Sequence, residues 1–241
     1  MCTGDLTVLR RIGQVLAGFP ALIFPDRCGA CECVCDGPFC PTCAESLLPV
    51  PPGCPVCGEP GDEALLPILR PRRCRPCRER APPFAAARAP YLHGGALCEA
   101  IHRLKYGGAE ELARPLAMLF EGCEPPRAQV VAHIPLHPAR LRARGYDQAA
   151  LLARELARRL GLPARALLDR VRPTRPQVGL DRTRREANVG GAFRARRPAA
   201  GLRVCLVDDV LTTGATAAAA ARALLAAGAA RVEVRTLSRA P

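Results

Sequence analysis

The segment from Val204 to Thr216, which reads Val-Cys-Leu-Val-Asp-Asp-Val-Leu-Thr-Thr-Gly-Ala-Thr, joins two adjacent carboxylates to a short threonine and glycine loop. Backbone N–H groups of such a loop, threonine hydroxyls and the N-terminus of a following helix can together cradle a phosphate dianion. Gly214 lets the backbone approach the ligand without an intervening side chain. The predicted cradle consists of Thr212, Thr213, Gly214, Ala215 and Thr216.

Asp208 and Asp209 need a different partner, because two carboxylates repel a phosphate. Vicinal sugar hydroxyls fit, since they donate hydrogen bonds that carboxylates accept. A turn capped by threonines, with acids at a helix start, would use the same residue types. The full combination is too specific for that, and no Gly-Lys-Ser/Thr of a Walker A loop is present. We expect one pocket sized for a ribose 5-phosphate group.

Cysteines form a second pattern with chemical meaning. Ten of the 14 lie between residues 26 and 83, and eight of these form four Cys-x-x-Cys pairs, the spacing of zinc knuckles. Four pairs predict two zinc sites of four thiolates each, and closed sites of this kind are structural. The predicted ligands are Cys28, Cys31, Cys40, Cys43, Cys54, Cys57, Cys74 and Cys77.

Spacing alone does not fix which pairs share an ion. Grouping neighbouring pairs is simplest, a crossed arrangement is possible, and Cys33 or Cys35 is close enough to replace a neighbouring ligand. Iron–sulfur ligation lacks a matching spacing, and a thioredoxin-like redox role lacks a strand-then-helix context. The zinc region can serve as a platform for protein or single-stranded DNA, although aromatic residues are scarce at 4% and base stacking is weakly supported.

The composition favours anionic partners. The 241 residues carry a formal charge of +13, and Lys105 is the only lysine among 35 basic residues. An excess of this size fits phosphorylated metabolites or a nucleic-acid backbone. Use of lysine at a single position suggests that a compact point charge is needed there.

The N-terminal segment, residues 1–25, is predicted to form an amphipathic helix. Leu6, Leu9, Ile12, Leu16 and Phe19 recur at helical spacing. Arg10-Arg11 before an apolar stretch imitates a twin-arginine signal, but the stretch lacks a small-residue cleavage site and is shorter than a membrane span. We therefore expect a cytoplasmic protein without a membrane span, in a reducing compartment where thiols persist.

After about residue 84 the residue pattern becomes that of an α/β domain. A strand, helix and strand unit at the end of the chain implies a parallel sheet, and ligands of such sheets bind beyond the carboxyl ends of the strands. The predicted helices are 95–106, 110–121, 147–160 and 215–227, and the predicted strands are 129–134, 203–207 and 231–237.

Several motifs together resemble one family. They are the loop above, Leu-Lys-Tyr at 104–106, Ile-Pro-Leu-His at 134–137, Arg-Gly-Tyr-Asp-Gln at 144–148, Thr-x-x-Gln at 174–177, Arg-x-x-Asn at 185–188 and Gly-Ala-Phe at 191–193. The loop is similar to the phosphoribosyl-diphosphate motif of type I phosphoribosyltransferases, and the whole set resembles the competence protein F family, also called the double zinc ribbon family. Asp147 departs from the usual Asn of that family.

The resemblance implies a type I phosphoribosyltransferase fold over residues 84–241, with a double zinc-ribbon module at 26–83. It implies phosphoribosyl diphosphate and Mg²⁺ as ligands, Pro135 and Leu136 in a pyrophosphate loop, and a role in DNA uptake. Asp208, Asp209, Lys105 and Arg144 become the candidate catalytic residues. His133 and His137 could act as acid/base groups, but lone histidines of this kind are more often structural. Residues 171–192 resemble a hood that closes over substrate and excludes water.

Two functions stay open at this point. In the first, a nucleophile attacks the ribose anomeric carbon of phosphoribosyl diphosphate and pyrophosphate leaves. In the second, the pocket senses a nucleotide precursor without catalysis, or the protein binds single-stranded DNA as a competence factor. The acceptor nucleophile cannot be read from the sequence.

Overall fold

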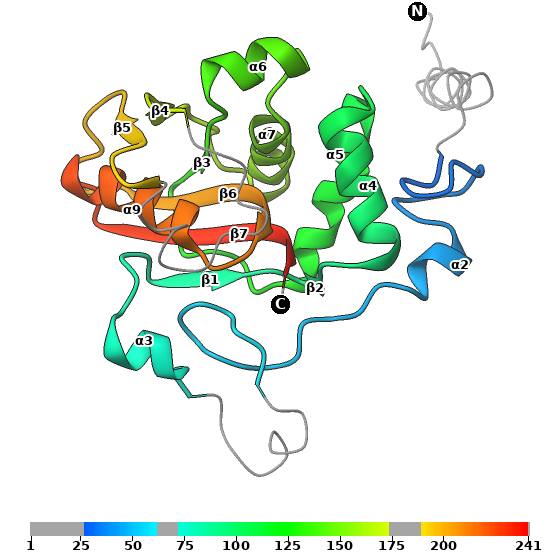
Figure 1. Ribbon diagram of the computed structural model, residues 1–241, viewed down its shortest axis with the longest axis horizontal. Coiled ribbons are helices and arrows are strands. Elements are labelled where there is room, and N and C mark those ends of the chain that lie inside the picture. The colour runs from blue at the N-terminus through cyan, green and yellow to red at the C-terminus, as the bar shows by residue number, and fades with distance from the viewer. Residues whose placement is uncertain (1–26, 62–71, 174–188, 241) are drawn as a thin grey trace, which may run out of the picture.

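The computed structural model describes residues 27–61, 72–173 and 189–240, and its centre is a parallel sheet (Figure 1). The strand order is β1-β7-β6-β3, and β2 also pairs with β7. Every one of these pairings is parallel. The strands are β1 (Ala86–Arg88), β2 (Tyr91–Leu92), β3 (Val130–His133), β6 (Arg203–Leu211) and β7 (Arg231–Arg239).

Helices cover both faces of the sheet, as the predicted α/β fold requires. Figure 1 shows α9 (Ala215–Ala226) in front of β6 and β7, with α7 (Gln148–Leu160) behind. One apolar cluster joins α7, α4 (Gly95–Tyr106) and α5 (Ala113–Ala117) to Val207 of β6, and a second joins α9 to Leu206. Because neighbouring strand residues point to opposite faces, β6 contributes to both clusters.

Several predicted elements are confirmed. The strand predicted at 129–134 is β3, and the helix predicted at 95–106 is α4. The helix predicted at 147–160 begins at Gln148 because Asp147 is its N-cap, and it ends at Gly161, whose φ of 64° suits glycine. The helix predicted at 215–227 is α9, which ends one residue earlier.

The single helix expected at 110–121 is wrong in detail. The segment is a 3₁₀ turn at Glu110–Leu112, then α5, then a second 3₁₀ turn at Met118–Gly122. Pro115 lies inside α5 and has no N–H to donate, so a regular α-helical ladder cannot run through the whole segment.

The last two strands are longer than expected, and this changes where the acid pair lies. The prediction ended the first of them at Val207, with Asp208 and Asp209 in the following loop. In the structure β6 continues to Leu211, because its pairing with β7 persists at Asp208 with Thr236 and at Leu211 with Arg239. The acids therefore belong to the carboxyl end of the strand itself.

Two expectations fall on residues outside the described part. The amphipathic helix predicted at 1–25 lies wholly there, and so does most of the hood predicted at 171–192. The described flanks of the hood form an antiparallel pair of short strands, β4 (Leu168–Arg170) and β5 (Phe193–Ala195). Among the described ranges, no helix has the length and hydropathy needed to cross a membrane.

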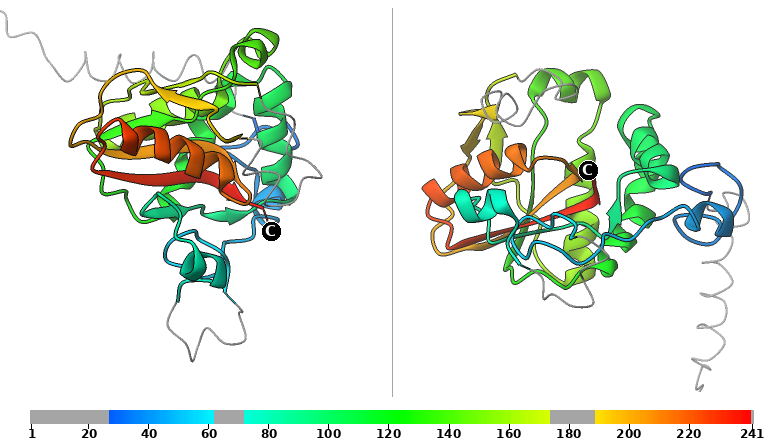
Figure 2. Two further views of the ribbon diagram at one scale, coloured as in Figure 1. Left: turned by 60° about the vertical axis from the view of Figure 1, so that its left-hand side comes forward. Right: turned by 60° about the horizontal axis from the view of Figure 1, so that its bottom comes forward.

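The cysteine-rich region contacts the α/β domain at several places, two of which involve its groups of cysteines (Figure 2). The first group docks on α4, where Arg103 donates to the carbonyls of Cys28 and Gly29 at 3.2 and 2.9 Å. The second group docks beside β1 and β7, where the Ala87 N–H donates to Val56 at 2.7 Å. Arg239 of β7 donates to the Cys57 carbonyl at 2.8 Å and pairs with Glu59.

Candidate functional site

A cavity of about 230 Å³ lies at the carboxyl end of β6. It is lined by eight of the residues predicted to form the ligand site, which come from four separate segments of the chain. They are Lys105, Leu136, Arg144, Asp208, Asp209, Thr212, Gly214 and Thr216. The cavity is also lined by residues to which the sequence assigned no role in the site, among them Tyr106, Gln148, Arg170 and Thr236.

Asp209 is held from both sides by the protein. Its side chain is 7% exposed, the Lys105 ammonium lies 2.7 Å from Oδ1, and the Gln148 amide donates to Oδ2 at 2.7 Å. Burial lowers the pKa of Lys105, but the Asp209 carboxylate outweighs this and the net pKa is raised. Gln148 in turn accepts from Arg144, whose guanidinium lies 5.0 Å from the centre of the Tyr106 ring. Asp209 thus ties β6 to α4 and α7.

Asp208 lies on the other face of the strand, toward α9 and β4. The two carboxylates nevertheless line one cavity, because that cavity caps the end of the strand. Burial, and then the nearby Asp209 charge, raise the pKa of Asp208 to about 8, although the Asp209 N–H donates to its Oδ1 at 2.9 Å. A carboxyl group with a strongly raised pKa in a cavity is typical of a functional site.

The threonine and glycine loop joins β6 to α9. Gly214 is the N-cap of α9 and has a φ of 77°, a left-handed conformation that favours glycine. The Ala215 N–H donates to Thr213 Oγ1 at 3.4 Å. Thr213 and Ala215 do not line the main cavity; they line a smaller one of about 60 Å³ on the other side of the loop, which Phe84 and Cys57 also line.

Three arginines make the cavity strongly positive. Arg140 and Arg144 come from α6 (Pro138–Arg144), and Arg170 ends β4. Arg170 is 9% exposed, and its guanidinium lies 5.3 Å from the centre of the Phe193 ring. Burial lowers the pKa of Arg170, and the nearby Asp208 carboxylate opposes this. In a chain whose basic residues are almost all arginine, nothing in the sequence distinguished this one.

The predicted pyrophosphate loop follows β3. Leu136 lines the cavity and Pro135 does not. The Leu136 N–H donates to Asp147 Oδ2 at 2.8 Å, while Asp147 Oδ1 accepts from Ala149 and Ala150 at 3.0 and 3.2 Å. Asp147 therefore fixes this loop against the start of α7. The His137 ring accepts from the Ala139 N–H at 3.3 Å and caps α6, which is a structural role.

Replacing Asp147 tests this link. Asp147→Ala removes the cap of α7 and the contact to Leu136, so we expect the free energy of unfolding to fall by about 1–2 kcal/mol. Asp147→Asn keeps one carbonyl oxygen for the cap and should cost less. Urea denaturation of the three proteins measures this, and an Ala variant as stable as wild type would contradict it.

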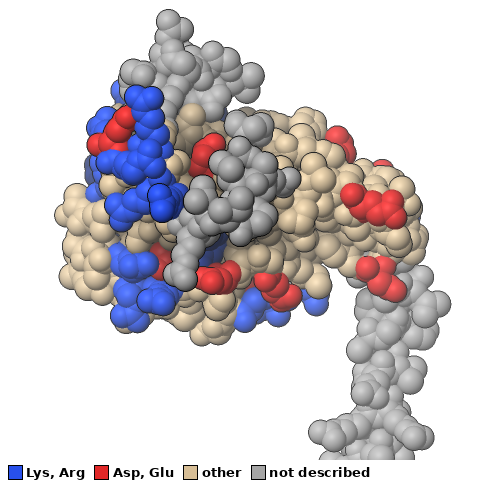
Figure 3. Space-filling view, turned by 90° about the horizontal axis from the view of Figure 1, so that it is seen from below, with Lys and Arg blue, Asp and Glu red and all other residues tan. Residues whose placement is uncertain are grey.

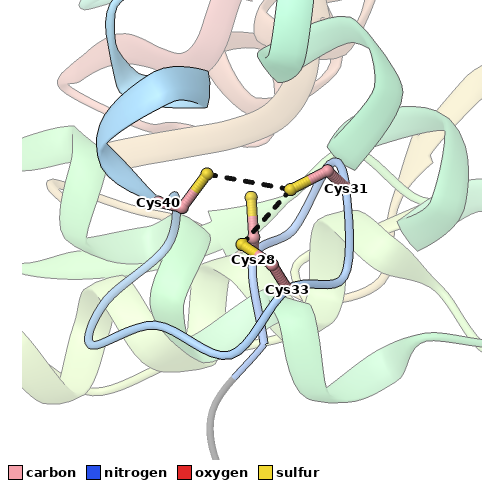
Figure 4. Close-up of side chains that lie close together, drawn as sticks. All are labelled: Cys28, Cys31, Cys33 and Cys40. Carbon is pink, nitrogen blue, oxygen red and sulfur yellow. Dashed lines mark hydrogen bonds between the residues drawn. The ribbon is translucent and has the colours of Figure 1, made fainter.

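The first cysteine cluster differs from the predicted set by one residue (Figure 4). The sulfurs of Cys28, Cys31, Cys33 and Cys40 all lie within 4.8 Å of one another. Cys33, which the sequence offered as a replacement, stands where Cys43 was expected. Cys43 lies against the same cluster. Its burial and its hydrogen bonds with Cys28 and the neighbouring cysteines raise the pKa of its thiol.

The second cluster consists of Cys54, Cys57, Cys74 and Cys77, as the grouping of neighbouring pairs predicts. A zinc ion about 2.3 Å from four tetrahedral sulfurs requires sulfur separations of about 3.8 Å. The Cys57–Cys74 and Cys31–Cys40 distances are 3.5 and 3.7 Å. Although burial opposes it, backbone hydrogen bonds lower the pKa of Cys54 to about 6, which favours the thiolate a metal needs. Both clusters are compatible with zinc binding.

Known proteins resemble this chain along most of its length. The model of the phosphoribosyl transferase domain matches residues 147–241. The DNA utilization protein YhgH of Salmonella typhi is 33% identical over 210 residues, which are 83% of this chain and 90% of that protein. The competence protein ComFC of Bacillus subtilis is 31% identical over 197 residues, 77% of each chain.

A solved structure, the glutamine phosphoribosylpyrophosphate amidotransferase of B. subtilis, aligns with 51% of this chain and 25% of its own, with 25% identity and a TM-score of 0.36. The full-length relatives carry the assignment. Alignments of this length exceed residues 84–241, so they include part of the cysteine-rich region, and the domain match at 147–241 includes the loop and the acid pair. The chain therefore belongs to the competence protein F family and has a type I phosphoribosyltransferase fold with a cysteine-rich N-terminal region.

Proposed function

We propose that this protein binds phosphoribosyl diphosphate together with Mg²⁺ in the cavity at the end of β6. The observation that carries the proposal is that one cavity is lined by the acid pair, by three arginines and by Thr212, Gly214 and Thr216 of the loop. The loop and the start of α9 suit the 5′-phosphate. Asp208, on the same side as α9, suits the ribose hydroxyls. Arg140, Arg144 and Arg170 suit the diphosphate.

The charges of the cavity support this division. A ligand with a phosphate and a diphosphate needs several cations, and the cavity wall provides Lys105 and the three arginines. Mg²⁺ would neutralise part of the diphosphate charge and be held mainly by ligand oxygens and water. Asp208 and Asp209 are the carboxylates that line the cavity. The same elements exclude a purely apolar ligand, because such a ligand would bury these charges without compensating them.

Thermal unfolding of the full chain with a panel of ligands tests the proposal. Phosphoribosyl diphosphate with Mg²⁺ should raise the melting temperature most, because saturation at about 100 times Kd adds about 2.7 kcal/mol of stability. Ribose 5-phosphate and pyrophosphate should each give a smaller shift, since each fills part of the cavity. No shift with the complete ligand, or an equal shift with pyrophosphate alone, would contradict the proposal.

Catalysis is distinguished from sensing by pyrophosphate release. In the enzymatic case the bond from the anomeric carbon to the diphosphate oxygen breaks, pyrophosphate leaves with the electron pair, and an acceptor nucleophile bonds to that carbon. Release that depends on an added acceptor, and is lost in an Asp208→Asn/Asp209→Asn double variant, supports the enzyme. Tight binding with no release for any acceptor supports a sensor.

We also propose that both cysteine clusters hold structural zinc, because four thiolates leave no position open for chemistry. The wild-type chain should contain one zinc ion per cluster by mass spectrometry of its metals. Cys77→Ser should remove the zinc of the second cluster, and Cys33→Ser that of the first, while Cys98→Ser should remove none. If Cys43→Ser lost the first zinc and Cys33→Ser kept it, Cys43 would be the fourth ligand.

Single-stranded DNA is a second candidate ligand, favoured by the surface around the second cluster. Figure 3 shows Lys and Arg side chains gathered on one side of this face. The exposed residues of the α3 segment (Arg75–Glu79) and its flanks include several arginines, and exposed Arg222 of α9 shares the smaller cavity with Arg80. The arginines of the segment are Arg72, Arg73, Arg75, Arg78 and Arg80. Two relatives named for competence or DNA utilization agree with this chemistry.

Salt dependence tests the DNA candidate. Binding of a labelled oligonucleotide should weaken steeply as salt rises. An Arg75→Ser/Arg78→Ser variant should weaken it further, whereas Arg158→Ser, on the exposed side of α7, should not. Binding that persists in the α3 variant would place any DNA contact elsewhere. Asp208→Asn should leave this binding unchanged, because the cavity is not the DNA surface.

A further inference from the structure

A wide groove lies between the first cysteine cluster and the helices behind the sheet. Its volume is about 1020 Å³, and it is far larger than the ligand cavity. Leu112, Pro115 and Met118 form an apolar strip along it, to which α7 adds Leu151. Met118 is 41% exposed, so its side chain is accessible to a partner at this strip.

Charged residues flank the apolar strip of this groove. Carboxylates come from Glu110, Glu111 and Glu155, and guanidinium groups from Arg114 and Arg154. Arg27 and Arg103 lie at the end next to the first cysteine cluster. An apolar floor with polar rims is the surface that an amphipathic helix recognises. The groove shares none of its lining with the ligand cavity, so the proposed function does not account for it.

We propose that this groove is the docking site of the chain's own N-terminal helix, residues 6–19. The described part of the chain begins at Arg27, and Arg27 lines the groove, so the 26 preceding residues are tethered at its edge. Tethering gives a millimolar effective concentration, which makes weak apolar contacts sufficient. A second copy or another protein would have to compete with this segment for the same strip.

The sequence of the segment complements the groove. As a helix about 21 Å long, the segment would carry a single apolar stripe of Leu6, Leu9, Ile12, Leu16 and Phe19. The seven residues from 20 to 26 can reach about 23 Å when extended, enough to turn the helix back over the groove. On such a helix Arg10 would border the stripe, whereas Arg11 and Gln14 would lie on the opposite face.

Hydrogen exchange of the full chain, followed by mass spectrometry, tests the proposal. The amides of residues 6–19 should be protected in the wild-type protein. Ile12→Glu, on the stripe, and Met118→Glu, in the groove, should each speed their exchange at least about tenfold, because each places a charge in the apolar contact. The double variant should exchange no faster than the more affected single variant, because both substitutions disrupt the same contact between helix and groove.

Matched substitutions control for the added charge. Gln14→Glu lies on the opposite helix face, and Leu48 is 60% exposed away from the groove, so Gln14→Glu and Leu48→Glu should keep the protection. Unchanged exchange of the β6 and β7 amides shows in each case that the domain is folded. Three results would overturn the proposal: a wild-type segment without protection, protection that Met118→Glu leaves intact, or protection lost on dilution, which would assign the groove to a second copy.

Discussion

Asp208→Asn is expected to make the protein more stable and to weaken its binding of Mg²⁺ and phosphoribosyl diphosphate by about 10- to 100-fold. The binding loss follows because bound Mg²⁺ and sugar hydroxyls favour the ionised form of Asp208, and a charged acceptor is worth about 1.5–3 kcal/mol. The gain in stability follows from the raised pKa of Asp208, about 8, since the folded state resists ionising this group. An amide of the same shape avoids that cost, which we expect to be about 2 kcal/mol at about pH 8.

The pH dependence of stability tests whether ionisation of Asp208 destabilises the folded protein. A carboxyl group whose pKa is raised in the folded state contributes stability at low pH and loses it as the pH rises from about 4 toward 8. The stability advantage of the Asp208→Asn variant over the wild-type protein should therefore be larger near pH 8 than near pH 6, when both proteins are measured by chemical denaturation. An advantage that is absent, or that shrinks with rising pH, would show that Asp208 is ionised without cost in the free protein.

Asp209→Asn should have the opposite effect on stability. It leaves the Lys105 ammonium, only 22% exposed, without its carboxylate. Lys105 and the Gln148 amide both donate to this side chain, and Asn has one oxygen to accept and one nitrogen that cannot. Removing one partner of a largely buried pair costs about 3–5 kcal/mol, and partial exposure of Lys105 brings the expected loss to about 2–4 kcal/mol. Replacing the two adjacent acids by Asn is thus predicted to change the free energy of unfolding in opposite directions.

A second, exposed pair provides the control. Arg75 and Glu79 of α3 form an ion pair whose side chains are 81% and 61% exposed, so Glu79→Gln should change the free energy of unfolding by less than about 0.5 kcal/mol. Lys105→Met combined with Asp209→Asn should cost less than the sum of the single variants, because neither charge is then left unpaired. Additive costs would show that the two groups do not depend on each other.

The sequence predicted the lining of the cavity best where one contiguous segment supplies it. The loop of residues 212–216 and the acid pair are contiguous, so their spacing alone indicated a phosphorylated pentose. What could not be predicted is how each acid is used. That depends on Gln148 of α7 and Lys105 of α4, which meet Asp209 only through packing of helices across the sheet.

Arg170 and the length of β6 show the same limit. Arg170 reaches the cavity because β4 pairs with β5 above the sheet, a contact between segments distant in the sequence that has no local signal. The extension of β6 through Asp208 and Asp209 depends on its pairing with β7. Local propensity disfavours Asp in strands, and the tertiary pairing overrides it.

The sequence predicted the number of cysteine clusters, but only part of their membership. Four Cys-x-x-Cys pairs fixed two groups of ligands, and the second group follows the pairs. In the first group Cys33 lies two residues beyond Cys31 and its sulfur is 3.4 Å from that of Cys31. Both Cys33 and Cys43 reach the cluster, so the choice between them depends on turn geometry that a spacing rule does not contain.

A crystal structure of the full chain with Mg²⁺ and phosphoribosyl diphosphate tests the central claim most directly. We expect the 5′-phosphate against the backbone of residues 213–216, the ribose hydroxyls within hydrogen-bond distance of the Asp208 carboxylate, and the diphosphate among Arg140, Arg144 and Arg170. Asp209 should keep its contacts with Lys105 and Gln148. A ligand bound with its phosphate elsewhere, or a cavity left empty at saturating ligand, would contradict the account.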